Sequence, residues 1–479
     1  MKKLEKHKLS LEQEKDNFKQ QLDEIEEKDV AIQMLSVFID EVGEGCFDAI
    51  EQISGVMLAN TAYLANDSIR SSAASSLPGL LKAAKKRGVD TAQVHQMAKT
   101  YNQNLYQAMQ KEIDTDTLIT QVTAFKDIID EAGPGLMTQE EVSHLAEKAL
   151  GMVTKSLARI EENNKINNDE AEDEDDVLDE DDLALIKEEN SNEHDLQIST
   201  AELMGVLFKT HKDFVGGLVQ KLRAEVIPEC FSSNEQKRFK FALFILDDMV
   251  EHLGPTYFSP EDFAQIVQAI CSFAGHTSSS LRQASAYGIG IIAQNTGDSF
   301  VTYSEQCLTA LKSTIDFPIS AKIQGKKEKL TMYNHARDNA IASVGKVIKY
   351  QTAVVKNNPN FSSQLVSFWL SLLPITHDVE EATAQYEFLS DFLAQDAEFI
   401  LGSTDPATGG AQLAKIYGEA FQEKYTGSMS AEAKLKLANA VRYLMTQAPA
   451  PTIESFKATC ENVLAAGSRA NVEAAFAHQ

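Results

Sequence analysis

The sequence predicts an all-α protein, and specifically a HEAT- or armadillo-like superhelical solenoid built from paired helices. Three observations support this fold class. Apolar residues recur at i, i+3, i+4 and i+7 along stretches such as 241–254 and 434–445. Only 24 of the 479 residues are glycine and 11 are proline, and most of these stand where such stretches end. The helical stretches also resemble one another with a period in the forties, which is typical of HEAT and armadillo units.

The repeat is visible when residues 67–84 are placed over 279–294 without a gap, because Arg70 then falls on Arg282. The same frame recurs around positions 28, 118, 239, 337, 382 and 434, and the interval from 118 to 239 leaves room for two units and an insertion. One helix pair cannot bury its apolar face alone, so each unit must stack on its neighbours. We expect the recurring arginines to connect neighbouring repeats.

Two segments interrupt the repeats. Residues 1–22 are expected to form a charged N-terminal helix or cap, in which Leu4, Leu11 and Phe18 recur every seven residues while the partner heptad positions are polar. Residues 161–195 carry 17 acids against two lysines, a net charge of 2 − 17 = −15 out of 44 − 71 = −27 for the chain. Such a segment cannot bury itself and is expected to be an acidic insertion loop. HEAT repeats are therefore expected at 23–160 and 196–479.

Composition and motifs exclude several classes of function. An acidic chain has no basic surplus with which to neutralise phosphates, which argues against direct nucleic-acid binding. No stretch approaches the roughly 20 apolar residues of a membrane span. The five cysteines lie far apart without a CxxC pair or zinc-ligand spacing, so we expect buried, reduced thiols and no metal or other cofactor. No phosphate-binding loop or nucleophile motif is present, so we expect no enzyme.

A candidate binding surface follows from the second helix of each pair, because these helices line the inner face of a solenoid. In 241–253 the core side is expected to hold Leu246 and Met249, with the acidic residues pointing the other way. Equivalent positions in other repeats are also acidic, although Lys82 and Lys349 interrupt the row. The alternative interpretation is that these are ordinary solvated helix faces. The predicted acidic row consists of Asp40, Asp127, Asp130, Asp247, Asp248, Glu251 and Asp391.

The core of the acidic insertion is a second candidate surface. It would act as an electrostatic lure or mimic for a basic ligand, and the alternative is a solvated insertion that is tolerated between helices. Its acidic residues are Asp169, Glu170, Glu172, Asp173, Glu174, Asp175, Asp176, Asp179, Glu180, Asp181 and Asp182.

Several stretches resemble, in sequence order, the C-terminal half of importin-β-type (karyopherin-β) nuclear transport receptors, and most of all the importin beta three branch. They are EEKDVAIQML (26–35), LDDMVEHLGP (246–255), LRQASAYGIGIIAQNTGD (281–298), AIASVGKVIKY (340–350) and WLSLLPI (369–375). The resemblance runs from about residue 24 to the end and includes an acidic insertion at 161–195.

The resemblance implies a superhelical HEAT array that binds basic cargo on its inner face, such as ribosomal proteins, histones and nuclear localisation signal peptides. It also implies weak contacts with phenylalanine-glycine-repeat nucleoporins, and cargo release by the GTPase Ran in its GTP-bound form. The family's principal Ran-binding surface lies in N-terminal repeats that have no counterpart in this sequence. The family shuttles between cytoplasm and nucleus through the nuclear pore.

Together, residues and resemblance predict a nuclear import receptor, or its C-terminal half, that binds basic cargo on an acidic concave surface with Ran-GTP-regulated release. The alternatives are a HEAT-repeat scaffold without a transport role and a chaperone for basic proteins that acts through the acidic segment. Basic cargo proteins, Ran and nucleoporins are the expected partners, with no direct nucleic-acid contact and no membrane insertion.

Overall fold

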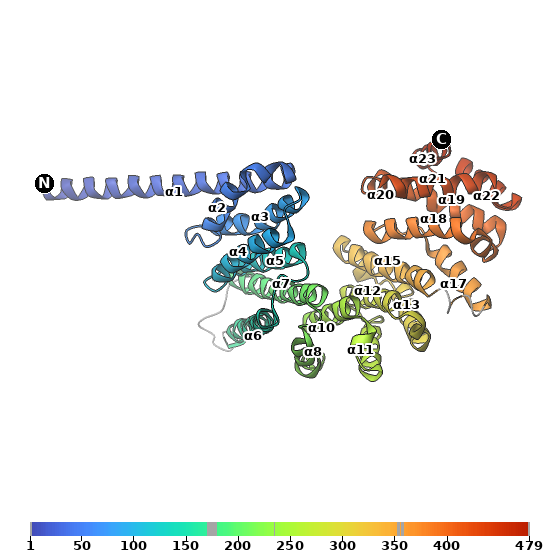
Figure 1. Cartoon of the computed structure of the whole chain (residues 1–479), viewed down its shortest axis with the longest axis horizontal. Helices are drawn as coiled ribbons and strands as arrows, with labels where there is room; N and C mark the ends of the chain where they lie inside the picture. Colours follow the sequence, from blue (N-terminus) through green and yellow to red (C-terminus); the bar gives the residue numbers. More distant parts are fainter. Residues whose placement is uncertain (1, 170–179, 234, 352–354, 356–358, 478–479) are drawn as a thin grey trace. The chain divides into compact units, whose positions relative to one another are not determined.

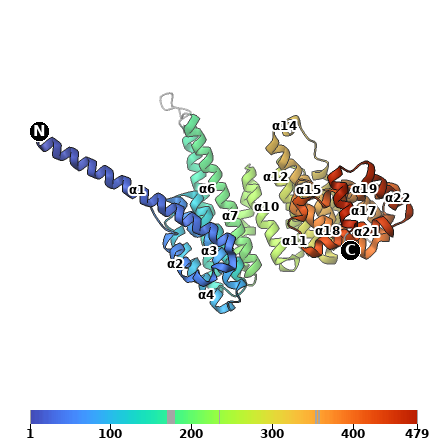
Figure 2. The ribbon, with the colours of Figure 1, turned by 90° about the horizontal axis from the view of Figure 1, so that it is seen from above.

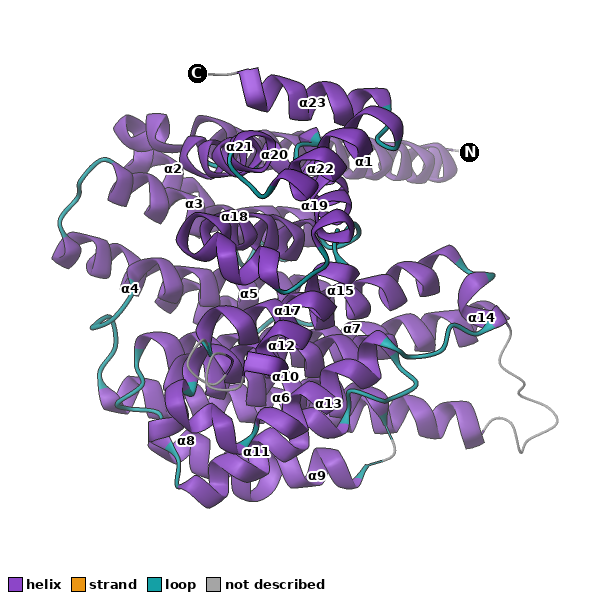
Figure 3. Cartoon of the chain, turned by 90° about the vertical axis from the view of Figure 1, so that its right-hand side faces the viewer, coloured by secondary structure: helices purple, strands orange, loops and turns teal. Residues whose placement is uncertain are grey.

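A computed structural model describes residues 2–169, 180–233, 235–351, 355 and 359–477 of the chain. All regular secondary structure in these residues is helical, as the uniform helix colouring of Figure 3 shows. The chain divides into two compact units, unit 1 (Met1–Ser233) and unit 2 (Asn234–Gln479). The predicted all-α fold is confirmed. No helix in the described part of the chain is both long and apolar enough to cross a membrane.

Unit 1 consists of helix pairs whose second helices stack on one another (Figure 1). We call these stacked helices the second-helix layer of the unit and their partners the first-helix layer. The second-helix layer contains α1 (Lys2–Val42), α3 (Asp67–Lys86), α5 (Thr115–Ala132) and α7 (Glu180–Thr210). The first-helix layer contains α2 (Ile50–Asn60), α4 (Thr91–Met109) and α6 (Gln139–Asp169), and the short helices α8 (Gly216–Lys221) and α9 (Ile227–Ser232) end the unit.

Unit 2 has the same organisation. Its second-helix layer contains α10 (Gln236–Asp248), α12 (Ser279–Asn295), α15 (Lys327–Tyr350), α18 (Val379–Gly402) and α21 (Ala431–Thr446). Its first-helix layer contains α11 (Pro260–Ser272), α13 (Ser304–Ile315), α17 (Pro359–Leu372), α19 (Pro406–Ala420) and α22 (Ala450–Asn462), and the remaining helices are α14 (Ala321–Gln324), α20 (Glu423–Thr426) and α23 (Ala466–Ala477). The last turn of α10 continues as a π-helical turn, Met249–Leu253.

Polar caps and glycines set the ends of the helices. The side chains of Asn66, Asp90 and Asp114 accept hydrogen bonds from backbone N–H groups in the first turns of α3, α4 and α5, which satisfies donors that have no partner inside the helix. Gly133 ends α5 with a φ of 76°, a conformation that residues with a Cβ atom avoid. Capping side chains at helix starts and a glycine at a helix end thus produce short turns between long helices.

Neighbouring second helices approach closely at glycines. A Cβ atom at Gly290 of α12 would lie 2.6 Å from Ser343 Oγ of α15, and one at Gly345 would overlap the Gln385 side chain of α18. Real Cβ atoms do not approach other atoms that closely, so only glycine permits these helix contacts. The sequence-based interpretation of the glycines in 288–294 as packing residues is confirmed, and Trp369 is likewise a packing residue because its side chain is fully buried.

Arg70 connects its repeat to the next one, as expected. Arg70 Nε and Nη2 donate hydrogen bonds of 2.8 and 2.9 Å to the two carboxylate oxygens of Glu112, which precedes the next second helix. Arg70 Nη1 also donates to the Tyr63 carbonyl oxygen. In unit 2 the equivalent Arg282 is fully buried. It donates to the His276 carbonyl oxygen at 2.7 Å.

The structure differs from the expected domain boundaries in two places. Residues 1–22 are not a separate element, because α1 runs unbroken to Val42 through a segment without glycine or proline. Most of 161–195 is helical, with α6 ending at Asp169 and α7 starting at Glu180, and the two helices lie side by side in Figure 2. Arg159 stabilises this pair by binding both carboxylate oxygens of Glu193, at 2.5 and 2.7 Å.

The Arg70–Glu112 pair gives a test of repeat stacking. The side chains are 10% and 2% exposed, and removing one member of a buried ion pair leaves an uncompensated charge. We expect Arg70→Ala to lower the free energy of unfolding by about 3 kcal/mol, measured by urea denaturation with circular dichroism. Lys86→Ala, an exposed change on the same helix, is the control, and an equally small effect of both variants would contradict the assignment.

Candidate functional site

In unit 1, lysines partly neutralise the negative charge of the predicted acidic row. Lys126 Nζ lies 3.1 Å from Asp127 Oδ1 on α5 and 3.3 Å from Glu202 Oε2 on α7. Lys209 Nζ of α7 lies 2.6 Å from Asp130 Oδ1. The Lys126–Glu202 and Lys209–Asp130 pairs cross from one second helix to the next, so Asp130 holds neighbouring helices together as well as contributing negative charge. Asp127 pairs with a lysine of its own helix.

Asp40 is exposed near the end of α1, and no ion pair to it occurs among the described residues. It lies beside Gly79 of α3, where an added Cβ atom would be 3.6 Å from Asp40 Oδ1. Asp40 therefore lies in the same layer as Asp127 and Asp130, at the contact of α1 with α3.

The prediction that Asp247 points away from the core is wrong. Asp247 is only 3% exposed, and its Oδ1 atom is buried without a hydrogen-bond partner. A Cβ atom at Gly288 of α12 would overlap the Asp247 carboxylate, so the missing side chain lets the neighbouring second helix cover this position. The helical wheel treats a helix as having one buried and one solvated side, whereas a helix inside a stack is covered on both flanks.

Burial raises the pKa of Asp247 well above its ordinary value, and the nearby carboxylates of Asp248 and Glu251 raise it further. Tyr287 of α12 donates a hydrogen bond of 2.8 Å from its hydroxyl to Glu251 Oε2. The pKa of Tyr287 is raised by burial first and then by Glu251. Three carboxyl groups and one phenol thus lie together where α10 meets α12, and we call Asp247, Asp248, Glu251 and Tyr287 the α10–α12 acidic cluster.

One oxygen or nitrogen atom each of Asp248, Glu251 and His252 lies within 4.8 Å of the others, a spacing at which a cation could be held. All three residues are half-buried. The sequence analysis expected no metal site and did not single out His252. Exposed acidic groups at such distances are common without an ion, and the same arrangement accepts hydrogen bonds from an ammonium or guanidinium group equally well.

Further along unit 2, lysines again form ion pairs that neutralise the charge of acidic residues. Lys346 of α15 lies 2.7 Å from Glu381 Oε1 of α18, and its ammonium is 5.4 Å from the centre of the Tyr287 ring. Lys436 of α21 lies 2.8 Å from Glu387 and 3.2 Å from Asp391. Hydrogen bonds to Glu387 and Asp391 raise the pKa of Lys436. Asp391 is therefore compensated, unlike Glu251.

Sequence reasoning missed Tyr287, Lys346, Glu381 and Lys436. Lys82 and Lys349 were expected to interrupt the acidic row. The structure places two further lysines against acidic residues of unit 2, since Lys346 pairs with Glu381 and Lys436 pairs with Glu387 and Asp391. A signal was available, because Lys346 and Glu381 are 35 residues apart, roughly one repeat. Opposite charges at that separation can meet across adjacent second helices.

The acidic segment is described only at its ends. Asp169 ends α6, Glu180 begins α7, and Asp181 and Asp182 are exposed on α7. The other residues predicted to act there lie outside the described residues: Glu170, Glu172, Asp173, Glu174, Asp175, Asp176 and Asp179.

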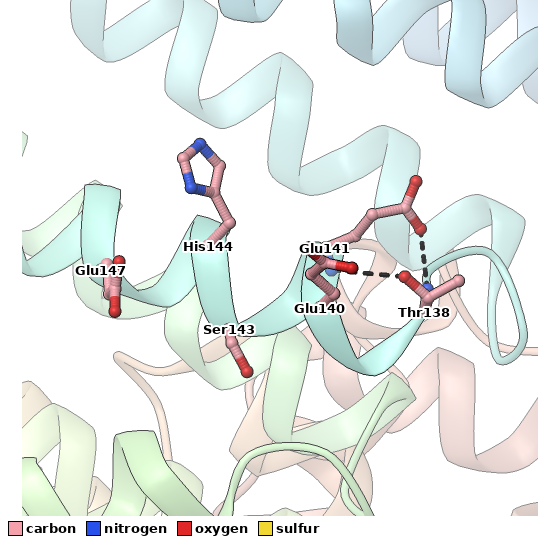
Figure 4. A pocket seen from close by; sticks show the side chains of 6 residues that line it. All are labelled: Thr138, Glu140, Glu141, Ser143, His144 and Glu147. Atoms are coloured by element: carbon pink, nitrogen blue, oxygen red, sulfur yellow. Dashed lines mark hydrogen bonds between the residues drawn. The ribbon is translucent and has the colours of Figure 1, made fainter.

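An open pocket lies at the start of α6 in unit 1 and is lined by Thr138, Glu140, Glu141, Ser143, His144 and Glu147 (Figure 4). Thr138 N–H donates to Glu141 Oε2 at 2.7 Å, and Glu141 N–H donates to Thr138 Oγ1 at 3.3 Å. This reciprocal capping box lowers the pKa of Glu141, chiefly through the backbone hydrogen bond. The acids at the start of α6 thus include a helix cap, and His144 and Ser143 point in different directions in the figure.

All five cysteines are buried, and no disulfide bond joins them in the described part of the chain. Cys271 and Cys307 are closest, with their sulfur atoms 4.0 Å apart. The hydrogen bond with Cys271 and burial both raise the pKa of Cys307, which disfavours the reactive thiolate.

Sequence comparison identifies relatives among nuclear transport proteins, although no family model matches the chain. The chain is 23% identical over 368 residues to a probable importin-5 homologue of Dictyostelium discoideum, covering 74% of the chain and 32% of that protein. It is 25% identical over 174 residues to importin subunit beta-3 of Saccharomyces cerevisiae, covering 36% of the chain and 14% of that protein. The chain thus spans a third or less of the length of these relatives.

Solved structures show the same fold. Kap121p bound to RanGTP matches 94% of the chain with a TM-score of 0.65 and 15% identity, and 37% of Kap121p is covered. Kap121p bound to the SUMO protease Ulp1p matches 91% of the chain with a TM-score of 0.60 and 16% identity, again with 37% of Kap121p covered. The paired helices and the stacked second-helix layers of this chain therefore have the HEAT-solenoid fold of these structures.

The relatives carry importin-5 and importin beta-3 names, so the chain is similar in sequence to members of the importin-β (karyopherin-β) family. The resemblance drawn from the sequence stretches is confirmed.

The burial of Asp247 predicts a pH dependence. A carboxyl group whose pKa is raised by folding stabilises the protein below its unfolded-state pKa of about 3.9, and this contribution is lost as the pH rises through the folded-state pKa. Asp247→Asn removes the charge, so we expect the variant to gain thermal stability over the wild type near pH 7 and to lose this advantage at about pH 4.

Differential scanning calorimetry at both pH values measures the effect. Asp298→Asn, at an exposed position in the same unit, is the matched control and should show no such change. A stability difference between Asp247→Asn and the wild type that stays constant with pH would contradict a raised pKa at Asp247.

Proposed function

We propose that this protein acts as a nuclear transport receptor of the importin-β type and holds basic segments of cargo on its second-helix layers. The similarity to relatives named importin-5 and importin beta-3 supports transport as the general role. The charges of the second-helix layers support a basic ligand. We do not propose an enzymatic activity, because the relatives are named as importins.

The observation that carries the proposal is the α10–α12 acidic cluster. Glu251 accepts its hydrogen bond from a neutral tyrosine hydroxyl, and no ion pair to Glu251 occurs among the described residues. The negative charge of Glu251 is therefore not offset by a cation. A lysine or arginine side chain placed here would form charge-assisted hydrogen bonds.

The other predicted acids are weaker contacts for cargo. A basic ligand at Asp130 would have to displace Lys209, and one at Asp391 would have to displace Lys436. Exchanging one ammonium group for another gives little net free energy at a solvated site. We therefore assign the main cargo contact to Glu251, with Asp40, Asp127, Asp130, Asp248 and Asp391 as secondary contacts that contribute long-range attraction.

The partners follow from the relatives. Kap121p has been solved with RanGTP, with Nup53p and with Pho4p. By analogy we propose that the chain binds Ran in its GTP form, nucleoporins and basic cargo such as ribosomal proteins, histones and localisation signal peptides. This activity would place it in the cytoplasm and the nucleus and at the nuclear pore. The acidic segment 169–182 would assist by attracting basic cargo.

Charge reversal at the cluster tests the cargo site. We expect Glu251→Lys to weaken binding of a lysine-rich localisation peptide at least about tenfold, because it removes a hydrogen-bond acceptor and adds a repulsive charge. Fluorescence anisotropy at two salt concentrations measures the affinity, which should fall as screening increases.

Glu261→Lys is the matched control. It makes the same change in net charge within unit 2, but it lies at an exposed position in the first-helix layer. Equal effects of the two variants would mean that only net charge matters and would remove the assignment of the site to Glu251.

A pull-down with and without Ran tests the transport role. We expect a column carrying the lysine-rich peptide to retain the chain, and Ran loaded with a non-hydrolysable GTP analogue to elute it, whereas Ran-GDP should not. The reason is that binding of Ran-GTP is proposed to release the cargo from the chain. Retention that Ran leaves unchanged would remove Ran-dependent release from the proposal. Absence of retention would favour the alternative of a HEAT scaffold without a transport role.

A further inference from the structure

The loop between α5 and α6, residues 133–138, is held by two histidines of other elements. His95 of α4 forms a hydrogen bond of 3.2 Å from its Nε2 atom to the Ala132 carbonyl oxygen, just before the loop. His211, the residue that follows α7, accepts a hydrogen bond of 3.1 Å at its Nε2 atom from the Met137 N–H group. The loop is therefore tied both to α4 and to the end of α7.

The hydrogen bonds of His211 determine its protonation state. A backbone N–H group can only donate, so the Nε2 atom that accepts from Met137 carries no hydrogen. The hydrogen of the neutral ring then lies on Nδ1, which is 2.7 Å from Thr210 Oγ1. Thr210 Oγ1 donates its own hydrogen to the Val206 carbonyl oxygen at 2.7 Å, so it accepts from Nδ1. Both ring nitrogens are thus engaged by the neutral imidazole.

A protonated His211 does not fit this arrangement. The imidazolium ring carries a hydrogen on each nitrogen, so Nε2–H would point at the Met137 N–H group and the hydrogen bond would be lost. His211 is only 4% exposed, so hydration of the charged ring requires the loop to move away. Protonation of His211 and closure of the α5–α6 loop therefore exclude each other.

The groups around His211 do not compensate a positive charge there. Burial is the largest effect on its pKa, and together with His95 it lowers this pKa below the ordinary value of about 6.5. Glu141 of α6 acts in the opposite direction, but it already accepts a hydrogen bond from the Thr138 N–H group (Figure 4). Other charged groups of the surrounding elements are Lys99, which acts on Glu141, the Lys209–Asp130 ion pair, and the exposed Lys212 and Asp213.

We propose that His211 is a pH switch that releases the α5–α6 loop and the first turn of α6 when its ring becomes protonated. The loop ends at Thr138, which caps α6 through its reciprocal hydrogen bonds with Glu141. Loss of the Met137 hydrogen bond therefore loosens this cap and the acidic side chains that line the open pocket at the start of α6. The switch is independent of the proposed cargo site, which lies in unit 2.

The direction of the pH dependence follows from the open loop. There His211 is hydrated and titrates near the ordinary pKa of about 6.5, whereas in the closed loop its pKa is lower. The preference for the closed loop is therefore complete above about pH 6.5 and declines as the pH falls from there towards the pKa of the closed form. One proton is involved, so the open fraction rises by up to about tenfold per pH unit in this range.

Amide hydrogen exchange of the full chain, corrected for the intrinsic exchange rate at each pH, measures this opening. We expect the protection of residues 136–142 to fall by up to about tenfold between pH 7 and pH 5.5. In His211→Gln the side-chain carbonyl accepts from Met137 N–H at every pH, because glutamine does not titrate, so protection should stay constant. His144→Gln, an exposed change on α6, is the matched control and should keep the wild-type pH dependence.

Two further measurements separate the switch from a purely structural role of the ring. His211→Ala removes the hydrogen bond at every pH, so its loop should be as weakly protected at pH 7 as at pH 5.5. The ring resonances of His211 in the wild type should titrate below pH 6.5. A wild-type loop whose protection does not change down to pH 5, or the same pH dependence in His211→Gln and the wild type, would overturn the proposal.

Discussion

The stacking of parallel second helices is the constraint on which the rest of each unit depends. A single helix pair leaves an apolar face in water, and burial of that face requires the next pair to lie within contact distance. Glycines at 288, 290 and 345 bring the backbones of α10, α12, α15 and α18 together, because a Cβ atom at any of them would meet a neighbouring side chain. Arg70 and Arg282 then anchor the turns beside the second helices.

The same close packing determines which acidic residues face solvent and how they are compensated. Asp247 is enclosed because Gly288 lets α12 approach. Asp127, Asp130 and Asp391 remain accessible, yet each lies within reach of a lysine. What the sequence presents as one uniform acidic row is therefore two kinds of residue: carboxylates that bind neighbouring helices and carboxylates, such as Glu251, whose charge is available to a ligand.

Much of the fold could be predicted from the sequence, because helical periodicity and a period in the forties are local or repetitive signals. The arginine positions and the packing role of the glycines followed from aligning 67–84 with 279–294. The burial of Asp247 could not be predicted, because it depends on a residue 41 positions away in the next second helix. The ion pairs of Lys346 and Lys436 depend on side-chain reach across two repeats, which a helical wheel for one helix does not represent. The continuity of α1 was predictable in hindsight, since residues 1–42 contain no glycine or proline.

The lysine–carboxylate pairs that cross between second helices also have a mechanical consequence. Lys126–Glu202, Lys209–Asp130, Lys346–Glu381 and Lys436–Glu387 each connect one second helix to the next. Such partly solvated pairs are weak and sensitive to ionic strength, so each adds a weak restraint between neighbouring helices to the stronger restraint of the apolar core. A basic ligand that binds the carboxylate in place of the lysine removes one of these restraints. Ligand occupancy and the bending stiffness of each stack are therefore coupled.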